Sequence, residues 1–320
     1  MTYVIVHALA PIFIIMLLGF YAGKSGMVDN KNVSLLNIFV MDFALPAALF
    51  SATVQTPWAG IIQQSPLILV LVLAMWIVYA AIYFVCTKIF NKSPQDAAVL
   101  TLTVALPNYA ALGLPILGSV LGEGGSTSLS VAVSIACGSV LMTPFCLLTL
   151  EREKARAAGG DAAGAGIGML PVLMWRSVIK PIVWAPLLGV VLSGLGVTMP
   201  ELVLASIKPL GLAATAGALF LTGVILSARQ LKINGVVVIS SVTTMLIQPF
   251  IAWGLVLVFG ISGHVAITAI LMVALSAGFF GVVFGNRFGV QSPDAEATLL
   301  ISSLLCIITL PLFITLTSGM

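Results

Sequence analysis

Long apolar segments alternate with short polar connections along this chain. Each apolar segment has about the twenty residues that a helix needs to cross the hydrocarbon core of a membrane. The predicted spans are residues 2–22, 33–54, 66–89, 97–121, 127–150, 177–197, 204–227, 234–260, 265–287 and 295–318. The pattern therefore predicts an all-α integral membrane protein with ten transmembrane helices.

One polar connection divides these spans five and five. The segment from Glu151 to Gly168 begins with charged residues and continues as an Ala/Gly tract, a composition typical of a flexible linker. We expect residues 1–150 to form a first unit of five spans, residues 151–170 a cytoplasmic linker, and residues 171–320 a second unit.

Short sequence matches recur in the same order in the two halves. For example, Val104–Leu106 matches Val273–Leu275, and Ala48–Phe50 matches Ala218–Phe220. Ordered matches of this kind indicate a duplication, and an odd number of spans makes the second copy enter the membrane from the opposite face. We therefore expect two inverted five-helix repeats, the plan of secondary transporters that bind substrate at the repeat interface.

The fourth span carries helix-breaking residues at its centre, namely Pro107, Asn108, Gly113 and Pro115. Proline removes a backbone donor and clashes with the preceding turn. Within a membrane such a break is tolerated where protein or a water-filled cavity covers the freed backbone groups. A plain proline kink is the alternative, because Pro and Gly are common in membrane helices. We expect a broken crossing helix that forms part of a site.

The ninth span is the partner of the fourth when the two halves are aligned, and it holds small and polar residues where the fourth span is broken. Two broken helices that cross would point half-helix N-termini at the crossing, and such ends favour anions. Asn108 and Tyr109 carry an amide and a hydroxyl that can donate to a carboxylate. Alternatively, Asn108 only caps the half-helix behind the break. The predicted substrate site comprises Pro107, Asn108, Tyr109, Gly113, Pro115, Ser276, Ala277, Gly278, Gly281, Asn286 and Arg287.

Two charged residues of the spans have competing interpretations. Asp42 lies well inside the second span, where a carboxylate is costly and commonly serves proton or cation coupling. We assign Asp42, with Pro46 and Ser51 of the same span, to coupling-ion binding or gating; the alternatives are an ion pair with Lys or Arg, or capping of a break near Pro46. Arg287 binds an anion through its planar fork or simply snorkels to the membrane interface.

Composition and charge narrow the class of protein. The chain has 320 residues, of which 60% are hydrophobic and 7% charged, with a mean hydropathy of +1.20 and a net charge of +3. These values exclude an ordinary soluble globule and give no sign of nucleic-acid binding. The four cysteines lack metal-ligand spacing. We found no catalytic motif, and we expect no enzyme activity and no cofactor beyond a coupling H⁺ or Na⁺.

Basic residues follow the odd-numbered spans almost without exception, and Lys208 is the one on the opposite side. By the positive-inside bias, those connections are cytoplasmic. We therefore expect a multi-pass protein of a bacterial inner membrane, surrounded by lipid, with both termini in the periplasm.

The residues of the fourth span also resemble a known signature. Leu106–Tyr109 followed by Gly113–Leu117 resembles LPNTxxxGIPxL of the PIN-type carriers in the auxin efflux carrier family, and Pro293–Asp294 and Leu310–Pro311 agree with the tenth helix of that family. Among bacterial members, the sequence is most similar to the malonate carriers that accompany malonate decarboxylase, through residues 37–50 and 101–118.

The resemblance implies a scaffold of helices 1, 2, 6 and 7, a transport domain of helices 3–5 and 8–10, a homodimer through the scaffold, and elevator-type alternating access. It also implies that Asn108 contacts the substrate carboxylate. The family has prolines at the ninth-helix crossing where this chain has Ser276 and Gly281, so we expect the second break to depend on glycine flexibility. The Gln that helps bind auxin is replaced near Ala136, and Asp42 has no counterpart in the plant carriers. These departures argue against an aromatic substrate and leave a small carboxylate as the expectation.

The sequence thus predicts a secondary active transporter of a small organic dicarboxylate, with malonate the first choice. Three alternatives stay open. They are a carrier of another small carboxylate, a cation/proton antiporter of similar plan, and a channel or receptor. An antiporter would need a pair of carboxylates at the crossing, and Asp42 is the only deep one. The coupling ion, the direction of transport and the oligomeric state are not fixed by the sequence.

Overall fold

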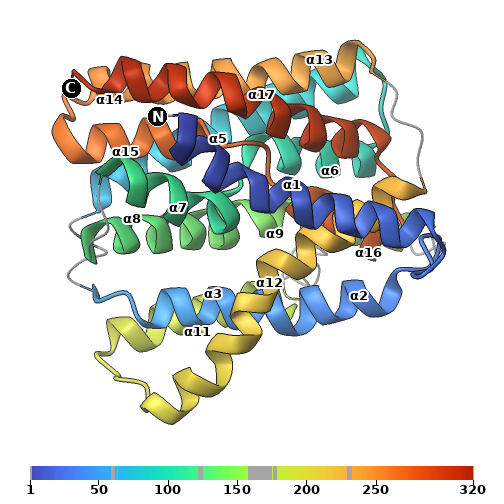
Figure 1. Ribbon diagram of the computed structural model, residues 1–320, viewed down its shortest axis with the longest axis horizontal. Coiled ribbons are helices and arrows are strands. Elements are labelled where there is room, and N and C mark those ends of the chain that lie inside the picture. The colour runs from blue at the N-terminus through green and yellow to red at the C-terminus, as the bar shows by residue number, and fades with distance from the viewer. Residues whose placement is uncertain are drawn as a thin grey trace.

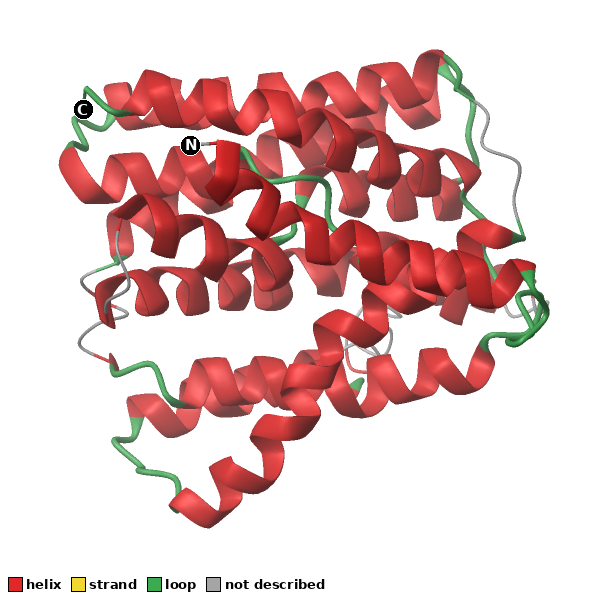
Figure 2. Ribbon diagram, viewed as in Figure 1, coloured by secondary structure: helices red, strands yellow, loops and turns green. Residues whose placement is uncertain are grey.

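The computed structural model describes residues 2–58, 62, 64–121, 125–157, 175, 179–228 and 233–319. These residues form helices joined by turns and loops, with one isolated β-bridge between Pro107 and Ala277 (Figure 2). Within the described part, six helices are long and apolar enough to cross a membrane: Ser34–Ser51, Ser65–Ile89, Leu129–Ala157, Glu201–Ile225, Gly235–Val258 and Pro293–Thr317. The all-helical, membrane-spanning class is therefore confirmed, whereas the count of ten transmembrane helices and their inverted-repeat relation stay predictions.

The helices follow one another along the chain with few long connections (Figure 1). The first half contains α1 (Thr2–Lys24), α2 (Ser34–Ile38), η1 (Phe39–Ala44), α3 (Leu45–Val54), α5 (Ser65–Phe84), η2 (Val85–Ile89), α6 (Pro94–Ala105), α7 (Tyr109–Leu121), α8 (Gly125–Cys137), η3 (Gly138–Met142) and α9 (Thr143–Ala157). The second half contains α11 (Pro181–Gly194), α12 (Glu201–Ser227), α13 (Gly235–Val242), η6 (Thr243–Ile247), α14 (Gln248–Val258), α15 (Gly263–Val273), α16 (Phe280–Arg287) and α17 (Pro293–Thr317). Each predicted span coincides with one helix or one run of helices.

Three prolines inside the spans follow a widened stretch of helix, and the helix continues past each of them. The π-helical segments η1, η3 and η6 each end two residues before a proline, at Pro46, Pro144 and Pro249. A proline cannot donate to the carbonyl one turn back and its ring crowds that turn, and a π-bulge is one way for the helix to continue past the defect. The second span therefore runs on through Pro46, and Asp42 does not cap a break there.

Glycines allow some helices to touch backbone to backbone. A Cβ atom on Gly223 would lie 2.0 Å from the carbonyl oxygen of Met16, and one on Gly19 would lie 2.1 Å from that of Phe220. These contacts join α1 to α12, which crosses it obliquely in Figure 1. Only glycine permits so close an approach. Both helices belong to the predicted scaffold, although the division into scaffold and transport domain stays a prediction.

A cluster of charges joins the beginnings of α6 and α17. Lys92 Nζ lies 2.7 Å from Asp96 Oδ2 and 2.6 Å from Asp294 Oδ2. Asn234, which caps α13, donates to Asp294 Oδ1 at 2.8 Å. Burial lowers the pKa of Lys92, but its hydrogen bonds to Asp294 and Asp96 outweigh burial and raise that pKa above its ordinary value. The cluster ties the start of α6 to the starts of α13 and α17.

Candidate substrate site at the crossing of two broken helices

The fourth span is broken between α6 and α7. Helix α6 ends at Ala105, Leu106 is extended with φ −104° and ψ 100°, and α7 begins at Tyr109. A helix that stops in this way leaves its last carbonyls without intrahelical donors. Side chains of the eighth span supply those donors: Thr244 Oγ1 donates to Val104 O at 3.1 Å, and Gln248 Nε2 donates to Ala105 O at 2.8 Å. The break is therefore satisfied by protein, as a membrane interior requires.

The ninth span is broken between Val273, the last residue of α15, and Phe280, the first residue of α16. Here the neighbouring helices accept from backbone N–H groups. Ala277 N donates to Ser302 Oγ at 3.1 Å, and Gly278 N donates to Thr103 O at 3.0 Å. The ninth span is thus interrupted as predicted, even though it contains no proline at this point.

The two breaks touch each other. Pro107 and Ala277 form an antiparallel β-bridge, and Asn108 N donates to Ser276 O at 2.9 Å. A short piece of sheet in the middle of a helical bundle pairs backbone groups that the broken helices leave free. The contact between the fourth and ninth spans, inferred from aligning the halves, is therefore present in the structure.

Glycine is needed in the ninth span for close approach, and our expectation that its conformational flexibility makes the break was wrong. Neither Gly278 nor Gly281 has a positive φ. A Cβ atom on Gly278 would lie 2.2 Å from Leu106 O, and one on Gly281 would lie 2.2 Å from Val99 O and 2.8 Å from Thr103 N. These glycines let the ninth span lie directly on the backbone of α6.

Two half-helices begin at the crossing, because α7 starts at Tyr109 and α16 starts at Phe280. The free N–H groups of a helix start carry a partial positive charge. Asn108, Tyr109 and Ser276 are each at most 2% exposed. Among the described residues, the hydroxyls of Tyr109 and Ser276 find no hydrogen-bond partner. Since buried hydroxyls are nearly always paired, the crossing has donor capacity that the protein itself does not use.

The other predicted residues of the fourth span have less direct roles. Gly113 faces α8, where a Cβ atom would lie 2.9 Å from Val131 Cγ1. The backbone of Pro115 lies within α7, and its side chain is outside the described part of the structure. Gly113 thus contributes to packing of the half-helix.

Asp42 and Arg287 form an ion pair with each other. Arg287 Nη1 donates to Asp42 Oδ1, joining the last residue of α16 to η1. Asn286 precedes Arg287, so both residues lie at the end of α16 opposite the crossing. The structure therefore contains the ion pair that was one alternative for Asp42, while anion binding and snorkelling of Arg287 both stay predictions. Ser51 Oγ accepts from Gln55 Nε2 at 2.8 Å within its own segment.

Several residues of the crossing were missed by the sequence analysis. Thr244, Gln248 and Ser302 bind the freed backbone groups, and they come from the eighth and tenth spans. A glutamine in the middle of an apolar span is itself a signal, because polar residues in a membrane face the bundle interior. Across the described residues, no group of three His, Cys, Asp or Glu side chains is placed to hold a metal ion.

Comparison with known proteins identifies the family of this chain. Residues 4–314 match the model of a family described as "Membrane transport protein". The chain is 27% identical over 310 residues to "Uncharacterized transporter YfdV" of Escherichia coli, covering 96% of this chain and 95% of that protein. It is 25% identical over 308 residues to a Rhizobium meliloti protein named "Putative malonate transporter", covering 93% and 91%. An "Uncharacterized transporter" of Methanothermobacter thermautotrophicus is 24% identical over 308 residues, covering 94% and 95%.

The family match extends over nearly the whole chain and includes both broken spans. It confirms the resemblance to the auxin efflux carriers that the fourth-span signature indicated. The chain therefore belongs to the membrane transport protein family, and it is a multi-pass membrane protein whose relatives named here are all transporters.

Proposed function

We propose that this protein is a secondary active carrier of small organic dicarboxylates, with malonate the first candidate. The observation that carries the proposal is the meeting of the two breaks, where Asn108 N donates to Ser276 O. Half-helices start just after this contact, at Tyr109 and at Phe280, and the buried hydroxyls of Tyr109 and Ser276 have no partner among the described residues. The relative named for malonate supports the choice of substrate.

The crossing suits a carboxylate for electrostatic reasons. Each half-helix start contributes about half a positive charge, and the amide of Asn108 with the hydroxyls of Tyr109 and Ser276 supplies directed donors. Neither Leu106–Tyr109 nor Ala274–Phe280 contains Lys or Arg. Dipoles and hydrogen bonds therefore replace a permanent cation, and the anion is held without a buried ion pair that would be hard to separate on release.

The proposed mechanism is alternating access of the elevator type. Helices 3–5 and 8–10, which contain both breaks, would move as a transport domain against a scaffold of helices 1, 2, 6 and 7. We further propose a homodimer through the scaffold, coupling to H⁺ or Na⁺, and a location in a bacterial inner membrane with both termini in the periplasm.

Uptake by reconstituted protein tests the proposal. Proteoliposomes loaded with unlabelled malonate are expected to exchange it for labelled external malonate, and unlabelled succinate and acetate define selectivity as competitors. Imposed proton and sodium gradients identify the coupling ion. Uptake no greater than that of protein-free liposomes, with or without gradients, would contradict carboxylate transport. Flux that does not respond to internal substrate would indicate a channel.

A cation/proton antiporter is less well supported. Such a carrier needs a pair of carboxylates at its crossing, and the one deep carboxylate predicted from the sequence, Asp42, is paired with Arg287 at the opposite end of α16. Proton-driven efflux of Na⁺ or K⁺ from the same proteoliposomes, without malonate exchange, would reverse the preference.

A further inference from the structure

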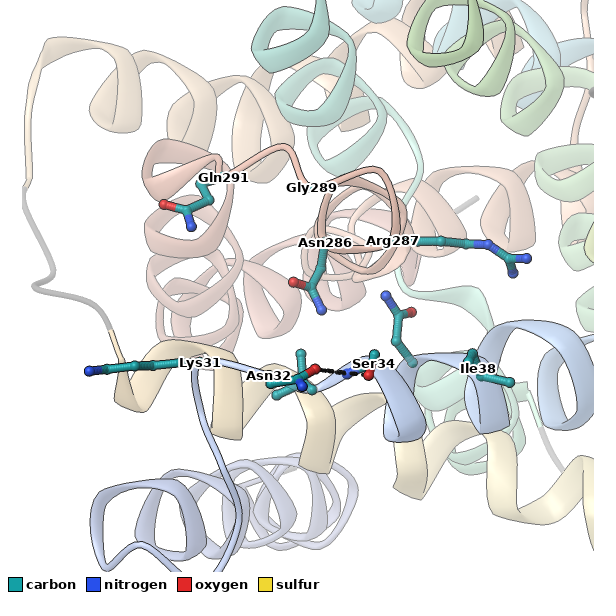
Figure 3. Close-up of a pocket in the computed structure, with 10 residues that line it drawn as sticks. Lys31, Asn32, Ser34, Ile38, Asn286, Arg287, Gly289 and Gln291 are labelled. Carbon is teal, nitrogen blue, oxygen red and sulfur yellow. Dashed lines mark hydrogen bonds between the residues drawn. The ribbon is translucent and has the colours of Figure 1, made fainter. Parts of the chain in front are cut away.

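A polar cavity of about 380 Å3 lies between α2 and α16 (Figure 3). Asn32, Ser34 and Asn37 line it on one side, and Asn286 and Arg287 line it on the other. Its volume falls within the range of small-molecule sites. We call this cavity the α2–α16 pocket. It is distinct from the crossing, because its α16 residues are the last ones of that helix and the crossing lies at the first.

Asn37 gives the pocket an acceptor that the protein does not use. The residue is 4% exposed, and among the described residues its Oδ1 atom has no hydrogen-bond partner. Buried polar atoms are almost always paired, so an unpaired one needs an explanation. An O–H group of a ligand would supply the missing donor. An ordered water molecule is the competing explanation.

Arg287 gives the pocket a cation that it shares with Asp42. The Nη1 atom of Arg287 donates to Asp42, and the guanidinium has five N–H donors in one plane. Figure 3 shows Arg287 extending along α2 past Ile38, while Asn286 is directed toward α2. Lys31 also lines the pocket. Because Asp42 offsets the charge of Arg287, one net positive charge remains, which suits a singly charged anion better than a dianion.

We infer that the α2–α16 pocket binds a small singly charged carboxylate that also carries an O–H donor, with the carboxylate on Arg287 and the O–H on Asn37 Oδ1. A half-protonated dicarboxylate has both groups, and so does a small hydroxy acid. The inference rests on the proposed function. If the substrate enters in its half-protonated form, each molecule brings one proton with it, and the substrate is then its own coupling proton carrier.

A substitution at Asn37 tests the hydrogen bond to the O–H group of the ligand without changing the charges of the protein. The charged side chains placed around the pocket and the adjoining end of α16 are those of Lys31, Arg287, Asp42, Asp29, Lys154 and Lys180. An Asn37→Leu substitution leaves all of them in place. It also replaces a buried amide, whose oxygen has no partner among the described residues, by an apolar group of similar size, which is expected to keep or raise the thermal stability.

Calorimetric titration of purified protein tests the inference. Malonate is titrated at several pH values across the second pKa of the free acid, beside monomethyl malonate, which has one charge and no O–H, and glycolate, which has one charge and a hydroxyl. In Asn108→Ala, whose crossing is impaired, we expect malonate to bind more tightly as the pH falls, and at low pH about tenfold more tightly than the monoester, as one hydrogen bond provides. Glycolate is expected to bind without this pH dependence.

The variants separate this inference from the proposed function. Asn108→Ala is expected to remove binding at the crossing, so the binding that remains in this variant is that of the α2–α16 pocket. Adding Asn37→Leu to Asn108→Ala should lower malonate affinity to that of the monoester and weaken glycolate binding. A double variant that still prefers malonate over its ester, glycolate that binds the double variant as well as Asn108→Ala, tighter binding of malonate to Asn108→Ala at high pH, or loss of all binding in Asn108→Ala would each overturn the inference and leave carboxylate transport standing. Failure of wild type to bind any carboxylate would contradict both.

Discussion

The two broken spans reach the same geometry by different means. In the fourth span, a proline and an extended Leu106 end α6, and side chains donate to the freed carbonyls of Val104 and Ala105. In the ninth span, neighbouring groups accept from the freed N–H groups of Ala277 and Gly278 instead. The first break follows from a local proline. The second break depends on Gly278 and Gly281, which let the ninth span lie against the backbone of α6. The crossing should therefore be more sensitive to crowding at the second break than to loss of the proline at the first.

The largest effect is expected for Gly281→Ala. The added Cβ would overlap Val99 O and Thr103 N, which are backbone atoms that cannot move aside. Overpacking of this kind costs about 3 kcal/mol, and malonate exchange should be lost as well. The matched control is Gly254→Ala on α14, where a Cβ meets nothing within 4 Å. Equal thermal unfolding temperatures of the two variants in detergent would show that the contact at Gly281 is not tight.

Loss of the donors at the first break should be the next largest effect. Gln248→Leu leaves the carbonyl of Ala105 without its side-chain donor, at a cost of about 2 kcal/mol for a buried unpaired group. Thr244→Val should act in the same direction on Val104. Thr222→Val is the control, because the Thr222 hydroxyl donates to Ala218 O within its own helix. If Thr222→Val lowered the unfolding temperature as much as Gln248→Leu and Thr244→Val do, Gln248 and Thr244 would have no special role at the break.

A smaller effect is expected at the second break from Ser302→Ala. This change removes the acceptor of Ala277 N, and we expect a loss of about 1 kcal/mol. The adjacent Ser303 is also buried, but its hydroxyl donates to Leu299 O in the same helix. Ser303→Ala should therefore change the unfolding temperature less than Ser302→Ala does, and the reverse order would argue against the contact between α17 and the break.

The smallest effect is expected for Pro107→Ala. Removing the proline mainly raises the entropy of the unfolded chain, worth about 1 kcal/mol or less, because Gln248 and Thr244 still hold the end of α6. Malonate exchange should be largely retained. A loss of stability as large as that of Gly281→Ala would mean that the proline, and not the surrounding side chains, makes the first break.

The sequence predicted what depends on local composition. The apolar segments located the helices, and Pro107 with Asn108 located the first break. What it could not predict depends on contacts between distant residues. The ion pair of Asp42 with Arg287 joins positions 245 residues apart, and the role of Gly281 follows from the backbone of α6 lying against it. Gln248 could have been singled out as a polar residue in an apolar span, but its partner Ala105 could not.

Exchange of labelled malonate by Asn108→Ala in proteoliposomes tests the central claim most directly. Asn108 sits where the two breaks meet, and its backbone N–H bond to Ser276 O does not depend on the side chain. If the crossing binds the substrate carboxylate, we expect exchange at least about tenfold slower than wild type, as for loss of one charge-assisted hydrogen bond, in a detergent-purified protein that still unfolds cooperatively. Exchange at the wild-type rate by an equally stable Asn108→Ala protein would contradict the assignment of the crossing as the substrate site.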